Sequence, residues 1–338
     1  MKFLFRCDAS PNIGKGHLYR CKALAQELKK QGATTFFICR TPNLDIKQEL
    51  GNSADVVVIL HPGTTLEQDI TITSSFYHQE QIDLAIIDHY NIDTRYQQQL
   101  YDSGVHWLQF DSFTNQTFLA DWILNTSPSA KEGDYQVPEG TCLLLGPQYA
   151  LLRQEFREVK RIKFRTEVKK ILLSFGGSND RSATTFCLKA LESLDKNIVV
   201  LTTNTNSSLP EIVACLSKNP HIKVIVDSPN VALHMANADI ALIAGGTTTF
   251  EVAGMGLPGF IIPLVKHQVA HAEAWHNTGS LINIGKLKNL SIGDVRQYVT
   301  DLIDNPAQRE AMAKAGMALV DCYGAERVAK ILLKEINA

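Results

Sequence analysis

Short apolar runs separated by helical patterns make up most of the chain. In the first half these runs lie at Lys2–Arg6, Thr35–Cys39, Val56–Leu60, Leu84–Ile87, Trp107–Phe110 and Trp122–Leu124. Each run is brief and apolar at nearly every position, as expected for parallel strands that are covered on both faces. After the first run, apolar residues at helical spacing predict a helix over Leu18–Lys30, which stops at Gly32.

The second half repeats this alternation. Strands are predicted at Ile171–Phe175, Ile198–Thr202, Lys223–Val226, Ile240–Ala244 and Gly259–Ile262, and helices over residues 182–193, 230–236, 248–256, 270–278 and 306–319. We therefore predict an α/β protein with two doubly wound parallel-sheet domains, residues 1–156 and 171–338, joined by a linker over residues 157–170. Seven of the fourteen linker residues are basic, which indicates a solvated linker or, alternatively, a phosphate-binding patch.

Composition narrows the class of protein. The 338 residues carry a formal net charge of −2, so neither nucleic acid nor an anionic membrane surface is expected as a partner. The seven cysteines are scattered without a Cys-x-x-Cys pair, which argues against a disulfide framework and a zinc ribbon. No run of residues is apolar enough for a signal peptide or a membrane span, and a cytoplasmic location is expected.

The first polar loop follows the strand predicted at residues 2–6 and leads into a helix. It contains Asp8, Gly14, Gly16 and His17. Two glycines let the backbone approach a ligand closely, and N–H groups at the start of the following helix attract anions. The positive end of a helix dipole disfavours imidazolium, so we expect His17 to be neutral and able to accept a proton. An ordinary glycine turn with a capping histidine is the alternative interpretation.

A second loop, over residues 244–254, follows the strand predicted at Ile240–Ala244 and also opens a helix. Its candidate ligand groups are Gly245, Gly246, Thr247, Thr248 and Glu251. Exposed backbone N–H groups and hydroxyl donors at a helix start suit a diphosphate, and a carboxylate suits the two hydroxyls of a ribose. The spacing Thr248-x-x-Glu251 also fits a capping box, which explains part of the pattern without any ligand.

Three further loops follow predicted strands, where open parallel sheets bind their ligands. They contribute Tyr90, the pair Gly176 and Gly177, and Gln268. A structural turn explains each of these loops equally well. Two histidines lie four residues apart at 267 and 271, but no Glu-x-x-His follows the zincin pattern, so no metal and no other cofactor is expected.

Together these motifs resemble a known family. The stretches that carry the resemblance are Gly-Lys-Gly-His ending at residue 17, Ile-Asp-His-Tyr at 87–90, Leu-Gly-Pro-Gln-Tyr-Ala-Leu-Leu-Arg at 145–153, Phe-Gly-Gly-Ser at 175–178 and Gly-Gly-Thr-Thr-Thr-Phe-Glu at 245–251. In this order they resemble the GT-B superfamily, which includes the peptidoglycan N-acetylglucosaminyltransferase. More specifically they resemble the UDP-sugar hydrolases of pseudaminic acid biosynthesis, and the stretch 145–153 is the most specific.

The resemblance implies two Rossmann-like domains with an active site in the cleft between them. It implies metal-independent hydrolysis of UDP-2,4-diacetamido-2,4,6-trideoxy-β-L-altropyranose to the free sugar and UDP, by a monomer that needs no cofactor. In this family the histidine that corresponds to His17 is the base that activates water, and the tyrosine that corresponds to Tyr90 lies in the site. The second domain holds UDP.

Two other functions remain open at this point. A GT-B glycosyltransferase would use the same UDP-sugar donor but an acceptor in place of water. A catalytically silent UDP-sugar-binding protein would keep the nucleotide loops without any chemistry. Release of UDP from a UDP-sugar with no acceptor present distinguishes the three.

Overall fold

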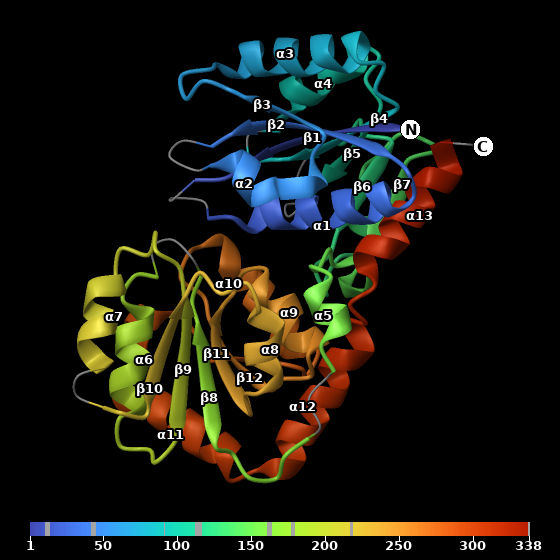
Figure 1. Cartoon of the computed structure of the whole chain (residues 1–338). Helices are drawn as coiled ribbons and strands as arrows, with labels where there is room; N and C mark the ends of the chain where they lie inside the picture. Colours follow the sequence, from blue (N-terminus) through green and yellow to red (C-terminus); the bar gives the residue numbers. More distant parts are fainter. Residues whose placement is uncertain are drawn as a thin grey trace. The chain divides into compact units, whose positions relative to one another are not determined.

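The computed structural model describes residues 1–10, 14–41, 45–90, 92–111, 117–160, 164–176, 180–216 and 219–336 (Figure 1). The chain divides into two compact units. The first unit comprises Met1–Arg153 together with Tyr323–Ala338, and the second comprises Gln154–Cys322. Each unit has its own parallel sheet and its own hydrophobic core.

Within its described residues, the first unit holds a seven-stranded parallel sheet with the order β3-β2-β1-β4-β5-β6-β7. The strands are β1 (Lys2–Asp8), β2 (Thr34–Arg40), β3 (Val56–Ile59), β4 (Leu84–Asp88), β5 (Trp107–Phe110), β6 (Trp122–Asn125) and β7 (Cys142–Leu145). The chain starts in the middle of the sheet and builds outward in both directions. The carboxyl ends of β1 and β4 are therefore neighbours, with Cys7 opposite Asp88.

Helices cover both faces of this sheet because its strands are apolar on both sides. They are α1 (Gly16–Lys30), α2 (Ile46–Leu50), α3 (Leu66–Gln79), α4 (Thr94–Asp102) and α13 (Gly324–Ile336), with 3₁₀ turns at Gly51–Ser53, Glu132–Asp134 and Pro147–Tyr149. In β1, Phe3 and Phe5 face a core with α1 and α13, whereas Leu4 faces a core with α3 and α4. This alternation follows from the two-residue repeat of a strand.

The second unit holds a six-stranded parallel sheet with the order β10-β9-β8-β11-β12-β13 in its described part. The strands are β8 (Lys170–Ser174), β9 (Asn197–Thr202), β10 (Ile222–Val226), β11 (Ile240–Ala244), β12 (Gly259–Ile262) and β13 (Ile282–Asn283). As in the first unit, the first strand, β8, lies inside the sheet, with β9 and β10 on one side of it and β11, β12 and β13 on the other. The register pairs Ile243 with Ser174 and Ala244 with Ile262, so the loops after β8, β11 and β12 are neighbours.

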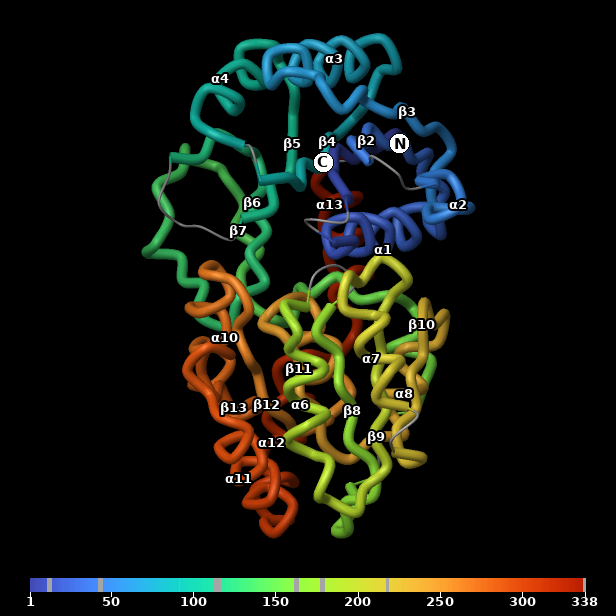
Figure 2. Tube along the Cα trace, turned by 90° about the vertical axis from the view of Figure 1, so that its left-hand side faces the viewer, coloured from blue at the N-terminus to red at the C-terminus, as the bar shows by residue number. Residues whose placement is uncertain are grey.

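Helices also cover both faces of the second sheet. They are α5 (Glu155–Glu158), α6 (Ala183–Leu191), α7 (Leu209–Leu216), α8 (Val231–Ala236), α9 (Thr248–Gly254), α10 (His267–Asn277), α11 (Ile292–Ile303) and α12 (Pro306–Leu319), with a 3₁₀ turn at Leu287–Asn289. One core joins Ile171 and Leu173 of β8 to α6 and α11. Figure 2 shows where these three elements lie in the second unit.

The predicted strands and helices are present, each strand to within two residues at either end and each helix to within three. The patterns missed β7 and β13 and, among the described helices, α2, α3, α4, α5, α7, α11 and α13. Helix α3 is rich in threonine and serine, which have low helix propensity. Its capping box, formed by Thr65 and Gln68, was the signal that could have found it.

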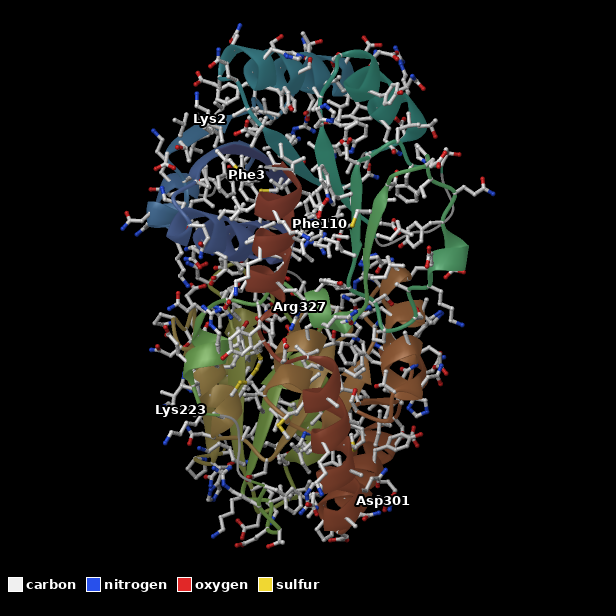
Figure 3. The ribbon with its side chains drawn as sticks, turned by 90° about the vertical axis from the view of Figure 1, so that its right-hand side faces the viewer. Lys2, Phe3, Phe110, Lys223, Asp301 and Arg327 are labelled. Atoms are coloured by element: carbon white, nitrogen blue, oxygen red, sulfur yellow. The ribbon has the colours of Figure 1, made fainter. Side chains whose placement is uncertain are left out.

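The last helix, α13, belongs to a different domain from the one predicted. The sequence assigned all of residues 171–338 to the second domain, but α13 packs on the first unit beside α1. Val328 and Leu332 of α13 are fully buried in the same core as Phe5. Arg327, labelled in Figure 3, donates to the carbonyl oxygen of Gln148.

The segment between the domains also differs from the prediction. Residues 155 and 156, assigned to the first domain from the sequence, form the start of α5 in the second unit, where Glu155 accepts a hydrogen bond of 3.0 Å from the N–H of Ala232. Of the predicted linker, Val168 is buried in the second core, and Lys170 begins β8. The described helices include none with the length and apolar character that a membrane span requires.

Candidate functional site

The carboxyl ends of β1 and β4 carry the first group of candidate residues. After β1, the N–H of Gly14 donates a hydrogen bond of 2.8 Å to the carbonyl oxygen of Ser10. Gly14 has a φ of +76°, a conformation that residues with a Cβ rarely adopt, so the turn alone requires this glycine. Helix α1 begins two residues later at Gly16 and places His17 in its first turn.

The His17 side chain makes a hydrogen bond with Asp88, at the end of β4, and does not cap its own helix. Its Nδ1 lies 2.6 Å from Oδ1 of Asp88, a carboxylate that is only 1% exposed. Burial by itself raises the pKa of the Asp88 carboxyl, but the Arg20 guanidinium and His17 together hold that pKa well below its usual range. We assign the His17 proton to Nδ1, facing the carboxylate, which leaves Nε2 as the proton acceptor.

Arg20 completes this arrangement one helical turn after His17. Its Nε donates to Oδ2 of Asp88 at 2.5 Å, and a second guanidinium nitrogen donates to Oδ1. That nitrogen also lies 3.2 Å from Nδ1 of His17, because both groups donate to the same oxygen. The guanidinium stacks on the ring of Phe110, labelled in Figure 3, at 4.4 Å from the ring centroid. Asp88 is thus fixed from two sides.

Tyr90, a candidate site residue, lies beside His17. The two ring centroids are 4.6 Å apart, with the rings nearly perpendicular at 76°. Tyr90 is 51% exposed, whereas the His17 side chain is 11% exposed. A partly exposed aromatic ring next to a proton acceptor is suited to contact with a bound sugar.

Asp8 does not join this group. Its carboxylate accepts hydrogen bonds from the fully buried Arg6 and, at 3.0 Å, from the N–H of Arg40. Arg6 in turn pairs with Asp69 of α3, which covers the sheet face opposite to α1. The contacts of Asp8 are those of a structural ion pair, and they give no support to the predicted substrate contact.

The second group of candidates lies at the neighbouring carboxyl ends of β8, β11 and β12. Gly176 follows β8 and is exposed, and Gly245 follows β11. Gly177 lies outside the described residues. A Cβ on Gly245 would lie 3.1 Å from Cβ of Gln268 and 3.2 Å from its carbonyl oxygen, so a larger residue would require the start of α10 to shift by a few tenths of an ångström.

Gln268 connects the loops after β11 and β12. Its Oε1 accepts a hydrogen bond of 2.8 Å from the N–H of Leu264, and its Nε2 faces Gly246. The structure therefore brings the candidate residues Gly245, Gly246 and Gln268 together.

The three threonines of this loop differ in exposure. Thr247 is exposed, Thr248 is half-buried, and Thr249 is fully buried. The first residue before α9 is Thr247, whose side chain makes no capping hydrogen bond, so the capping box predicted for Thr248 is not formed. The hydroxyls of Thr247 and Thr248 stay candidate ligand groups together with the half-buried Glu251.

Sequence reasoning missed two residues of the first group and one of the second. Asp88 and Arg20 lay within motifs but received no role, and His271 was considered only as a metal ligand. An acidic residue at the carboxyl end of a central strand was a usable signal for Asp88. Among the described residues, no group of three or more His, Cys, Asp or Glu side chains is arranged to hold a metal ion.

Comparisons with known proteins show that the second half is similar to a described family of domains. Residues 160–326 match the glycosyltransferase family 28 C-terminal domain. Over 332 residues the chain is 23% identical to the spore coat polysaccharide biosynthesis protein SpsG of Bacillus subtilis, covering 96% of each. It is 26% identical over 277 residues to the UDP-2,4-diacetamido-2,4,6-trideoxy-beta-L-altropyranose hydrolase of Campylobacter jejuni, covering 80% of this chain and 95% of the relative.

Solved structures share the fold over the whole chain. MurG of Acinetobacter baumannii matches with a TM-score of 0.71 and 16% identity, covering 99% of this chain and 100% of MurG. UDP-GlcNAc 2-epimerase of Neisseria meningitidis bound to UDP-GlcNAc matches with a TM-score of 0.69 and 14% identity, with the same coverage. The predicted fold class, two doubly wound parallel-sheet units of the GT-B type, is thereby confirmed.

Proposed function

We propose that this protein hydrolyses a UDP-sugar to UDP and the free sugar, with UDP-2,4-diacetamido-2,4,6-trideoxy-β-L-altropyranose as the substrate. The observation that carries the proposal is the hydrogen-bonded series Arg20–Asp88–His17 at the start of α1. It holds one imidazole in the tautomer that a general base for water requires. The similarity to the Campylobacter jejuni hydrolase extends over 80% of the chain and supports the choice of substrate.

The proposed reaction transfers the sugar from UDP to water. Nε2 of His17 takes a proton from the water while the water oxygen bonds to C1 of the sugar. The bond between C1 and the diphosphate oxygen breaks, and its electron pair stays with UDP. The imidazolium that forms is stabilised by the ionised Asp88, 2.6 Å from Nδ1. Such a base contributes about 10²–10⁴-fold to the rate.

The loops of the second unit are proposed to hold the nucleotide. N–H groups in the first turn of a helix have no intrahelical acceptor, and they favour the negative charge of a diphosphate. Gly245 and Gly246 lead into α9, and Thr247 and Thr248 add hydroxyl donors. Glu251 would accept hydrogen bonds from the ribose hydroxyls. Stabilising the charge on departing UDP in this way is electrostatic catalysis by fixed dipoles.

A glycosyltransferase is the second candidate, because residues 160–326 match a glycosyltransferase domain. The nucleotide loops would serve either reaction equally well. The difference lies in what attacks C1, a water or the hydroxyl of an acceptor.

The deciding experiment incubates the pure protein with a panel of UDP-sugars, without any acceptor, and follows UDP by chromatography. A hydrolase releases UDP over many turnovers, and we expect the diacetamido-trideoxy sugar to react fastest. The variant His17→Asn serves as the control for contaminating hydrolases. Absence of UDP release from every sugar in the panel would refute the proposal, and release only after an acceptor is added would establish the transferase.

A further inference from the structure

A half-buried histidine outside the proposed chemistry lies beside Thr249, next to the nucleotide loop. His271 belongs to α10, and its ring contacts the rings of Phe250 and Trp275. Its Nε2 lies 2.9 Å from the indole Nε1 of Trp275 and 3.0 Å from Oγ1 of Thr249. Thr249 and Trp275 are both fully buried. The three side chains therefore form one hydrogen-bonded series, of which His271 is the half-buried member.

The direction of these bonds follows from the chemistry of the partners. An indole N–H can only donate, so Nε2 of His271 must be the acceptor, and the ring carries its proton on Nδ1. Burial, with a smaller contribution from His267, lowers the pKa of His271 to about 4. The ring is thus neutral at pH 7 and can keep its acceptor role.

Thr249 links this series to the backbone of the nucleotide loop. Its hydroxyl donates to the carbonyl oxygen of Gly246 at 2.8 Å, and its N–H lies 3.2 Å from the same oxygen. The single hydroxyl proton is shared between this carbonyl and Nε2 of His271. Fixing the Thr249 rotamer therefore fixes the direction of the Gly246 carbonyl and, through the same peptide plane, of the N–H of Thr247.

Helix α10 supports the loop at a second point. Gln268 lies one helical turn before His271, and its side chain faces Gly246. The two residues share one face of α10, since positions three apart are neighbours on a helix. One end of the loop thus rests on Gln268 and the other on Thr249 and His271.

From these contacts we propose that His271 is a positioning residue for nucleotide binding, which acts through Thr249 to hold the Gly246–Thr247 peptide with its N–H directed to the diphosphate. The inference rests on the proposed function for the identity of the nucleotide as UDP. It assigns to the buried Thr249 an internal role, distinct from that of Thr247 and Thr248. His271 touches neither the sugar nor the water.

The test measures UDP binding to the full chain by calorimetry, with no turnover required. Thr249→Val keeps the volume of the side chain and removes its hydroxyl, and His271→Leu removes the acceptor. We expect each variant to raise the dissociation constant of UDP about tenfold, the scale of one lost hydrogen bond. His271→Gln, which retains an acceptor, should raise it no more than about threefold. His276→Leu makes the same kind of change at an exposed position of α10 and should leave it unchanged.

The double variant distinguishes a shared positioning role from two independent structural effects of the substitutions. Because Thr249→Val and His271→Leu interrupt the same series, their combination should also raise the dissociation constant about tenfold rather than a hundredfold. Thermal unfolding confirms that each variant is folded at the temperature of the titration. Folded variants that bind UDP like the wild type, or independent effects in the double variant, would overturn the inference.

The same titration distinguishes this inference from the proposed function. A wild-type protein that does not bind UDP removes the nucleotide assignment and the inference with it. A wild-type protein that binds UDP and loses affinity on substitution supports the inference, whatever UDP-sugar it cleaves. The steady-state kinetics of the same variants give a further check. KM for the UDP-sugar should rise, while kcat at saturation should change by less than about threefold.

Discussion

The substitution Asp88→Asn tests the proposed base most directly, because it keeps the size of the side chain and removes its charge. A carboxylate accepts from both His17 and Arg20, whereas an amide offers one oxygen and one NH₂ group. If the NH₂ group faces His17, Nδ1 must accept, the ring proton moves to Nε2, and the acceptor for water is lost. If it faces Arg20, the tautomer survives but the imidazolium loses its anionic partner.

Both orientations remove what the base needs in the transition state. Asp88 is 1% exposed and the His17 side chain 11%, so solvent screens their interaction little. We expect kcat to fall at least about 10²-fold, which corresponds to about 2.7 kcal/mol in the activation barrier. KM should change little, because the nucleotide loops lie elsewhere in the chain. The loss of charge beside Arg20 should also lower the melting temperature.

The assay follows UDP release at saturating UDP-sugar for the wild type, Asp88→Asn, His17→Asn and the double variant. Asp121→Asn is the matched control, because Asp121 also pairs with Nδ1 of a histidine, His106, at 3.1 Å. That pair precedes β5 and β6, at the opposite end of the strands from His17. Its loss should leave kcat unchanged.

Circular dichroism establishes that each variant is folded at the assay temperature. If Asp88 acts only through His17, the double variant should be no slower than His17→Asn alone. A folded Asp88→Asn protein that keeps more than about a tenth of kcat would refute the base assignment. A double variant that is slower by the product of the two single effects would show that Asp88 acts independently of His17.

Three further predictions concern the nucleotide and the bond that breaks. Glu251→Ala should raise KM for the UDP-sugar more than it lowers kcat, since a ribose contact binds ground and transition states alike; a lowered melting temperature with unchanged KM would instead give Glu251 a structural role. Activity should persist in excess EDTA, because backbone donors at helix starts are proposed to hold the diphosphate, and a loss reversed by Mg²⁺ would contradict this. In H₂¹⁸O the label should enter the free sugar, which must be examined before its anomeric oxygen exchanges, and ¹⁸O in the β-phosphate of UDP would disprove attack at C1.

Much of the fold was open to prediction because its signals are local. Runs of four to seven apolar residues mark strands that are buried on both faces, and the intervening helices carry their own periodicity. Strands β7 and β13 escaped notice although β7 is as apolar as its neighbours. Helix α4 escaped because its glutamines and tyrosines leave only a narrow apolar stripe.

The candidate site was predictable to the extent that it depends on backbone. Glycines and hydroxyl residues after strands identified both loops, whereas the contact between the rings of His17 and Tyr90 is known only from the structure. The partners of side chains were less predictable. Asp8 and Asp88 both end central strands, yet Asp8 pairs with Arg6, and only Asp88 meets His17.

The sequence by itself thus determined the strands, the position of the glycine loops and the presence of His17 at a helix start, because each depends on residues close together in the chain. The tertiary structure decided the rest. It joined His17 to an aspartate 71 residues away, directed Asp8 to the other face of the sheet, and placed α13 on the first unit. An amphipathic helix can pack on any apolar surface, and a carboxylate can pair with any nearby cation, so only the packed chain selects the partner.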